Sequence, residues 1–177
     1  MKIKDYIFPQ TAWVLALPLA LTFVLSPPVA YAEQDGHAKA VTLLREADTL
    51  LGNGSTDMAI KTVKRAITAD PKSPGPYNRL GYMLLQEGRL DDAINAFTSA
   101  LKIKPNLRTA KTGIGLALLK KGDLKAAKNE LTAALLLNPY PSVTHYALGL
   151  VYDKMNDYEM AITQFKEGIK TFKRGQK

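Results

Sequence analysis

The feature that most constrains the fold of this chain is a self-similarity with a period of 34 residues. The stretch LGYMLLQEGRLDDAINAF, residues 80–97, returns in modified form when the chain is shifted by that interval. The shift aligns small, apolar and proline residues in sets: Leu80-Gly81, Ile114-Gly115 and Leu148-Gly149; Ala59, Ala93, Ala127 and Ala161; Phe97, Leu131 and Phe165; Ala66, Ala100, Ala134 and Gly168; Pro71, Pro105 and Pro139. Because no gap is needed, we expect repeated structural units that stack on one another.

Each unit contains two helical patterns separated by a glycine. In the unit around residue 80, the first pattern places four residues at i, i+3, i+4 and i+7, which is one face of a helix: Tyr77, Leu80, Gly81 and Leu84. Gly88 interrupts this pattern, and the same break recurs at Gly54 and Gly122. The second pattern begins near Leu90 and ends at Pro105, since proline cannot continue a helix. We therefore predict two short antiparallel helices per unit.

In period, order and residue size, these units resemble tetratricopeptide repeats. Three clear repeats span residues 74–107, 108–141 and 142–175, and a degenerate one spans 40–73, with Ala47 at the glycine position and Glu46 at the leucine position. Residues 33–39 form a lead-in and 176–177 a short tail. The resemblance implies an all-α fold, a right-handed α-solenoid of antiparallel helix pairs.

The first 32 residues have the layout of a secretory signal peptide. Lys2 and Lys4 precede an apolar segment, residues 12–25, and the small-x-small sequence Ala30-Tyr31-Ala32 follows it. Pro18 and two later prolines weaken the alternative of a membrane anchor. We expect cleavage after Ala32 and export to a bacterial periplasm. If the segment is retained, the protein is anchored in the inner membrane.

The chain has few residues suited to catalysis. It has no cysteine, which excludes disulfides and thiolate chemistry. His37 and His145 are far apart in sequence, and no nucleophile elbow or phosphate-binding glycine loop is present. Asp91 and Asp92 fall in the first turn of a predicted helix, where carboxylates favour the helix dipole. We therefore expect no enzyme activity, no cofactor and no metal site.

The net charge of +8 raises the possibility of an anionic partner. Nucleic-acid binding requires basic residues gathered on one surface, whereas the lysines here are spread over turns and several predicted helices. We expect a solvated basic surface and no nucleic-acid partner. Attraction to an acidic protein or an anionic membrane face remains the alternative.

The resemblance implies that the first helix of each unit lines a concave groove for a protein or peptide partner. The residues expected on that face are Asn78, Arg79, Tyr82, Gln86, Thr109, Thr112, Leu116, Lys120, Tyr146, Leu150 and Lys154. The alternative, an unused face with ordinary exposed residues, stays open. Chaperone-binding members of the family use a clamp of lysines, asparagines and an arginine. The matching positions hold Asn78, Tyr82, Gly113, Val143 and Tyr146, and only Asn78 fits, so co-chaperone activity is not expected.

The last unit departs from the family pattern at its end. Lys173 stands where proline is usual, and families of this kind often add a polar helix after the final repeat. We expect the segment 157–173 to cap the array with its own charges, among them Glu159, Lys166, Glu167 and Lys170. A monomer is expected, with a dimer through this C-terminal helix as the alternative. The whole pattern predicts a periplasmic scaffold in cell-envelope assembly, such as pilus or secretion machinery, outer-membrane biogenesis or cytochrome maturation.

Overall fold

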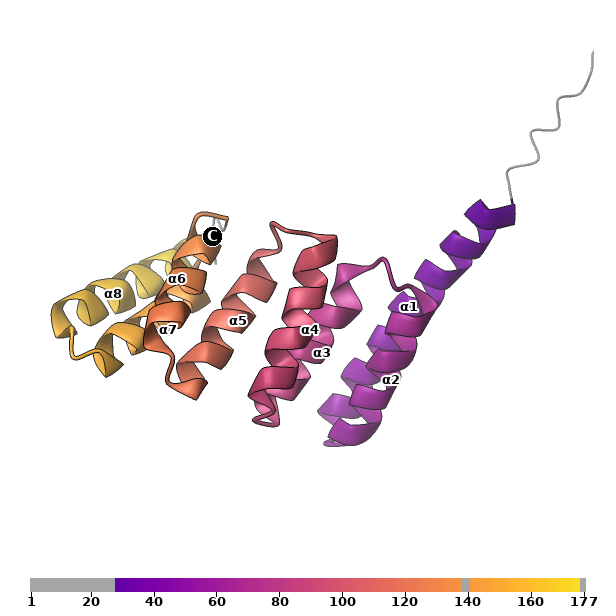
Figure 1. Ribbon diagram of the computed structural model, residues 1–177, viewed down its shortest axis with the longest axis horizontal. Helices are drawn as coiled ribbons and strands as arrows, with labels where there is room; N and C mark the ends of the chain where they lie inside the picture. The colour runs from indigo at the N-terminus through magenta and orange to yellow at the C-terminus, as the bar shows by residue number, and fades with distance from the viewer. Residues whose placement is uncertain (1–27, 138–140, 176–177) are drawn as a thin grey trace, which may run out of the picture.

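The fold is an array of paired helices. A computed structural model describes residues 28–137 and 141–175, and this part contains eight α-helices and no strand. The helices are α1 (Pro28–Gly52), α2 (Thr56–Ala69), α3 (Pro74–Gln86), α4 (Leu90–Ile103), α5 (Arg108–Lys121), α6 (Leu124–Leu135), α7 (Ser142–Lys154) and α8 (Tyr158–Gly175). Each odd-numbered helix packs most extensively with the next one, and the four pairs follow one another from α1 to α8 (Figure 1). The predicted all-α array of helix pairs is confirmed.

The turn inside each pair has the same geometry in all four units. Gly54, Gly88 and Gly122 adopt φ values of 77°, 73° and 84°, and Asn156 takes the equivalent position in the last unit with φ 61°. Glycine, and less readily asparagine, tolerates this left-handed conformation. The next residue then donates its N–H to a carbonyl five residues back, as Arg89 does to Leu84 at 2.9 Å. The predicted breaks are therefore helix ends of one type.

Small residues on the first helices make room for one large residue on each second helix. A Cβ added at Gly81 would lie 2.6 Å from the ring of Phe97, and one at Gly115 would lie 2.5 Å from Cγ of Leu131. Gly113, in the next unit, also lies against the Phe97 ring, and a Cβ there would be 2.3 Å from Cζ. Phe97 is fully buried as a result. The interpretation of Gly81 as a close-packing position is confirmed.

The degenerate first unit packs like the others. Ala47 takes the place of the glycine, and Val63 takes the place of Phe97 one period earlier. Both are fully buried in one cluster with Met83 of the next unit. The smaller valine leaves space for the alanine methyl group, so the two departures compensate each other.

The N-terminal segment is described only in part. Residues 1–27 of the predicted signal peptide lie outside the described residues, as do Pro139 and the tail at 176–177. α1 begins at Pro28, so the predicted lead-in at 33–39 is helical, and Ala40, one residue after it, is buried. None of the described helices is both long enough and apolar enough to cross a membrane.

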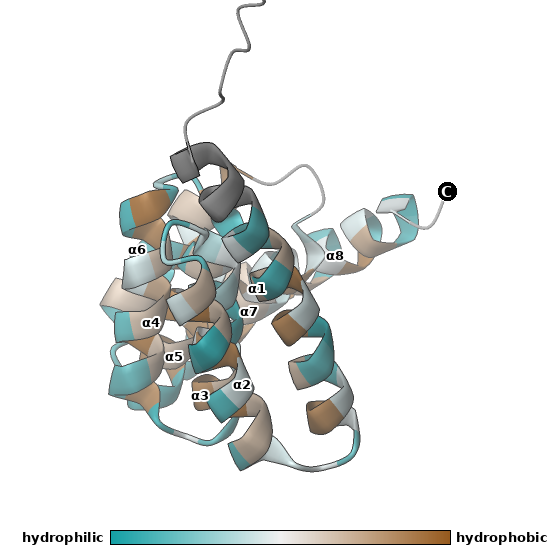
Figure 2. Cartoon of the chain, turned by 90° about the vertical axis from the view of Figure 1, so that its right-hand side faces the viewer, coloured by the Kyte–Doolittle hydropathy of each residue, from teal (hydrophilic) through white to brown (hydrophobic). Residues whose placement is uncertain are grey.

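The C-terminal helix α8 combines charged residues with exposed apolar ones. α8 carries the expected charges, but Ile162, Ile169 and Phe172 are more than half exposed. Seen from the α1 end, α8 projects beyond the other helices and carries hydrophobic residues on its side (Figure 2). The helical spacing of these apolar residues places them on one uncovered face, which the expectation of a cap formed by charged residues did not include.

Candidate partner-binding surfaces

The first helices α3, α5 and α7 lie next to one another and are joined by polar contacts. Tyr82 Oη donates a hydrogen bond to the carbonyl oxygen of Thr109 at 2.8 Å, which links α3 to α5. Lys120 Nζ of α5 donates a hydrogen bond of 3.3 Å to the carbonyl oxygen of Leu85 in α3. The hydroxyl groups of Thr112 and Thr144 lie 3.1 Å apart and link α5 to α7. These contacts hold the first helices as one surface, which we call the first-helix face.

The burial of Thr112 corrects the predicted site. The sequence placed it on the exposed face, but it is only 6% exposed because Thr144 of α7 covers it. The error came from treating each unit alone, whereas α5 also packs along one side against the first helix of the next unit. A buried threonine whose hydroxyl is already bonded does not contact a partner.

Tyr82 is also more enclosed than expected. Its ring meets the Phe97 ring edge-on, with centroids 5.0 Å apart, and its hydroxyl is bonded to Thr109. Burial raises the pKa of the Tyr82 hydroxyl because the ionised form loses its hydration. Tyr82 therefore contributes to the packing between α3, α4 and α5, and only part of its surface lines the first-helix face.

The remaining predicted residues form two columns with one residue per unit. The exposed column is Gln86, Lys120 and Lys154, and the half-buried column beside it is Tyr82, Leu116 and Leu150. Members of each column are one repeat period apart, so the columns run across α3, α5 and α7. Together they give an apolar strip with a polar and cationic edge.

Three other predicted residues lie beside these columns. Asn78 is half-buried, and its Oδ1 has no hydrogen-bond partner among the described residues. Arg79 is held in an ion pair with Asp48 of α1. Tyr146 is 57% exposed, although it occupies the same repeat position as the buried Thr112. The surface thus becomes more open and more apolar toward the C-terminal pair.

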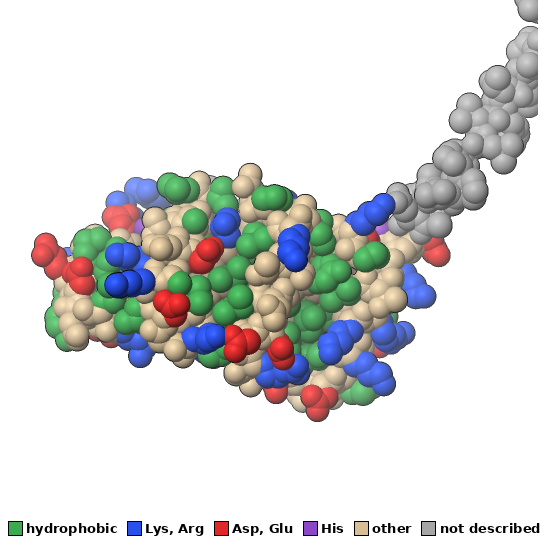
Figure 3. All heavy atoms as spheres, viewed as in Figure 1, with side chains coloured by type: hydrophobic (Ala, Val, Ile, Leu, Met, Phe, Trp, Pro, Cys, Tyr) green, Lys and Arg blue, Asp and Glu red, His purple; other side chains and the backbone are tan. Residues whose placement is uncertain are grey.

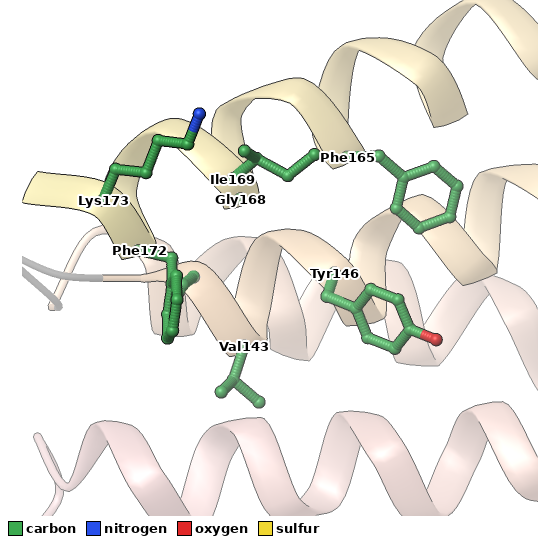
Figure 4. Close-up of a pocket in the computed structure, with 8 residues that line it drawn as sticks. Val143, Tyr146, Phe165, Gly168, Ile169, Phe172 and Lys173 are labelled. Carbon is green, nitrogen blue, oxygen red and sulfur yellow. The ribbon is translucent and has the colours of Figure 1, made fainter.

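That C-terminal pair contains a groove that the sequence analysis missed. The groove has a volume of about 750 Å³ and lies between α7 and α8. Its apolar lining consists of Val143, Tyr146, Phe165, Gly168, Ile169 and Phe172. Figure 4 shows Val143 and Tyr146 on α7 beside the aromatic rings of α8, while Lys173 directs its amine away from α7. We call this the end groove.

A signal for the end groove was present in the sequence. Ile162, Phe165, Ile169 and Phe172 are spaced at i, i+3, i+7 and i+10, which is the spacing of a helical stripe. Charged residues, among them Lys166, Glu167 and Lys170, alternate with the apolar ones and make the stripe less evident. Of the residues that line the groove, only Tyr146 was predicted as a contact.

The titratable groups lie in separate structural pairs. His37 Nδ1 is 2.7 Å from Asp70 at the N-terminal pair, and His145 Nδ1 is 2.8 Å from Gln164 at the C-terminal pair. Asp92 bonds Arg89, and Asp91 bonds Lys121 of α5. No group of three or more metal-ligating side chains occurs within residues 28–137 and 141–175. Acidic residues lie among the basic ones over the face shown in Figure 3.

Family models of the tetratricopeptide repeat match residues 44–107, 84–139 and 143–172. These matches span most of the array and agree with the four helix pairs and their repeated turns. The chain is a tetratricopeptide-repeat protein. Members of this family are protein-interaction scaffolds, and its helix pairs account for the first-helix face described above. The comparison with curated proteins found no match.

Solved structures with this fold include MamA and a bacterial repeat protein. MamA 41-end from Desulfovibrio magneticus RS-1 is 27% identical, with a TM-score of 0.65 and 75% of each chain covered. TTC0263, a thermophilic tetratricopeptide-repeat protein in Thermus thermophilus, is 22% identical, with a TM-score of 0.68, covering 75% of this chain and 74% of that chain. The second such domain of human RPAP3, in complex with the HSP70 peptide SGPTIEEVD, is 22% identical, with a TM-score of 0.61, covering 66% of this chain and 97% of that chain.

Proposed function

We propose that this chain is a periplasmic scaffold that binds a protein or peptide along its first-helix face during cell-envelope assembly. The observation that carries the proposal is the pair of columns across α3, α5 and α7. One is an apolar strip of Tyr82, Leu116 and Leu150, and the other is the exposed set Gln86, Lys120 and Lys154.

This arrangement suits a linear segment that lies across several units. The apolar strip offers area for hydrophobic side chains, and the amide and ammonium groups at its edge offer donors for carbonyl and carboxylate oxygens. The RPAP3 domain, which shares the fold, was solved with a short peptide. By analogy, a peptide-like segment with acidic groups is the partner class that fits this face best.

The binding part of the proposal is tested by capture with charge-reversed variants. The full chain and its Lys120→Glu/Lys154→Glu variant are used as bait in periplasmic extract, with Lys102→Glu/Lys125→Glu as a matched control. Lys102 and Lys125 are exposed on second helices. A protein retained by the wild type and the control but lost from the first variant is the expected result. Equal retention by all three would rule out the first-helix face as the binding surface.

The location is tested separately by N-terminal sequencing of the exported protein. The order of Lys2, Lys4, the apolar segment at 12–25 and Ala30-Tyr31-Ala32 supports cleavage and release to the periplasm. A mature chain beginning at Glu33 is the expected result. An intact N-terminus in the membrane fraction would instead support the alternative, an anchored protein that contacts anionic partners through its basic surface.

A further inference from the structure

The end groove occupies the position at which each preceding unit receives another helix. α5 packs against α3 and α4, and α7 packs against α5 and α6. The next member of that series would lie against α7 and α8. None of the described residues occupies this position, and the groove of about 750 Å³ is found there.

The contacts of Phe165 differ from those of its equivalents in the preceding units. Its equivalents, Phe97 and Leu131, are fully buried, and Phe97 is held between Gly81 of its own unit and Gly113 of the next. Phe165 has the first of these contacts, with Gly149, and its ring lines the open groove on the other side. The half-buried Phe165 therefore presents the surface that a following first helix covers elsewhere.

Tyr146, which also lines the groove, repeats the same comparison. Tyr146 is equivalent to Thr112, which α7 covers, and it is 57% exposed. The groove therefore has the shape of a surface that receives an α-helix, and it continues the series of helix interfaces inside the array.

The residues that occupy the equivalent position inside the array indicate which residue type a matching helix needs. Gly113 meets Phe97, and Ala147, one period after Gly113, lies in one core cluster with Leu131. A small residue is needed because a larger side chain would collide with the ring. A helix that covers the end groove therefore needs glycine or alanine opposite Phe165.

The charges beside the groove favour an acidic occupant. Lys166, Lys170, Lys173 and Arg174 lie together on the exposed side of α8. Glu167 bonds Lys170 at 3.0 Å, and this contact lowers the pKa of the Glu167 carboxyl. If a second copy docked symmetrically through α8, it would bring two such basic edges together, which costs electrostatic energy.

We propose that the end groove binds an amphipathic α-helix of an acidic protein partner, with a glycine or alanine of that helix packed on Phe165. This site is separate from the first-helix face. The chain would then hold two partner segments, one across its first helices and one at its C-terminal end.

The proposal is tested by fluorescence anisotropy with the full chain and a labelled, lactam-stapled peptide. The 14-residue peptide keeps the α5 residues that pack on α4, namely Ala110, Gly113, Ile114 and Ala117, and has glutamate at its exposed positions. One control peptide has leucine in place of the glycine, and the other has lysine in place of the glutamates. Each control is expected to bind at least about tenfold more weakly.

Variants of the protein locate the binding. Ile169→Glu/Phe172→Glu should weaken binding of the acidic peptide at least about tenfold, while Lys120→Glu/Lys154→Glu on the first-helix face should leave it unchanged. Lys166→Glu/Lys173→Glu should weaken binding of the acidic peptide and strengthen binding of the lysine peptide. A variant that had merely unfolded would not show this exchange. Failure of the acidic peptide to bind, or equal binding of all three peptides, overturns the proposal and leaves the first-helix proposal intact.

The second-copy alternative is decided by sedimentation equilibrium of the full chain. A monomer over the measured concentration range is the result expected from the charge argument. A dimer that Phe172→Glu dissociates would show that the groove is a self-association site and would overturn the acidic-helix proposal.

Discussion

The middle of the array and its C-terminal pair use the same repeat positions but bury them differently. In α3–α6, the large second-helix residues Phe97 and Leu131 are fully buried. In α7–α8, Phe165 occupies the same position and lines an open groove. The local sequence is similar in both regions. The difference is that none of the described residues forms a helix that packs on α7 and α8 as α5 packs on α3 and α4. In a stacked repeat, burial is a property of the interface between units.

The largest effect should come from truncating the same residue in the two regions. Phe97→Ala should lower the free energy of unfolding by about 3–5 kcal/mol, because it leaves a cavity between Gly81 and Gly113. Phe165→Ala should cost clearly less, since one side of the ring already faces the groove. Urea denaturation of both variants measures the two costs. Equal losses would mean that the end groove is covered in solution.

A smaller effect is expected from enlarging a close-packing glycine. Gly115→Leu should destabilise the chain by about 1–3 kcal/mol, because a Cβ there already lies 2.5 Å from Leu131. Gly52→Leu is the matched control, since nothing lies within 4 Å of a Cβ at Gly52. Thermal unfolding compares the two. An unchanged midpoint for Gly115→Leu would contradict the packing role of this glycine.

The smallest expected effect on stability is a difference between two tyrosines of the first helices. Tyr82→Phe should cost about 1 kcal/mol, because it removes the bond to Thr109, whereas Tyr146→Phe, at an exposed position, should cost almost nothing. Chemical denaturation at neutral pH measures both. A loss for Tyr146→Phe equal to that for Tyr82→Phe would contradict the contrast between the two regions.

Tyr82 should also make the stability of the chain depend on pH in alkaline solution. Because burial raises the pKa of Tyr82 in the folded chain, the unfolded chain loses this proton at a lower pH. The stabilisation from neutral Tyr82 is therefore complete below about pH 10 and falls as the pH rises above that value. Wild type should therefore lose more stability than Tyr82→Phe as the pH is raised from neutral to above about pH 10, which chemical denaturation at each pH measures.

The structure also changes which variants are informative about binding. A Tyr82→Ala substitution removes packing against Phe97, so loss of a partner in that variant would not identify a contact. Lys120, Lys154 and Phe172 are exposed, and their substitution leaves the core side chains in place, although Lys120→Glu also removes the bond to the Leu85 carbonyl oxygen. They replace Tyr82 as probes of the two surfaces.

The amino-acid sequence determined the repeat, the helix pairs and the turns. These depend on interactions within one unit: the helical spacing of apolar residues, the left-handed turn at Gly88 and the fit of Gly81 to Phe97. Each of these signals is local, and each recurs after one period, so the helix pairs and the turns between them could be read from the sequence.

Only the tertiary structure decided which of these positions reach the surface. Thr112 and Tyr146 share one repeat position, yet the first is buried under α7 and the second is exposed. Phe97 and Phe165 differ in the same way. The physical reason is that exposure depends on whether another helix packs against that face, and this is set by the place of a unit in the stack rather than by its own residues.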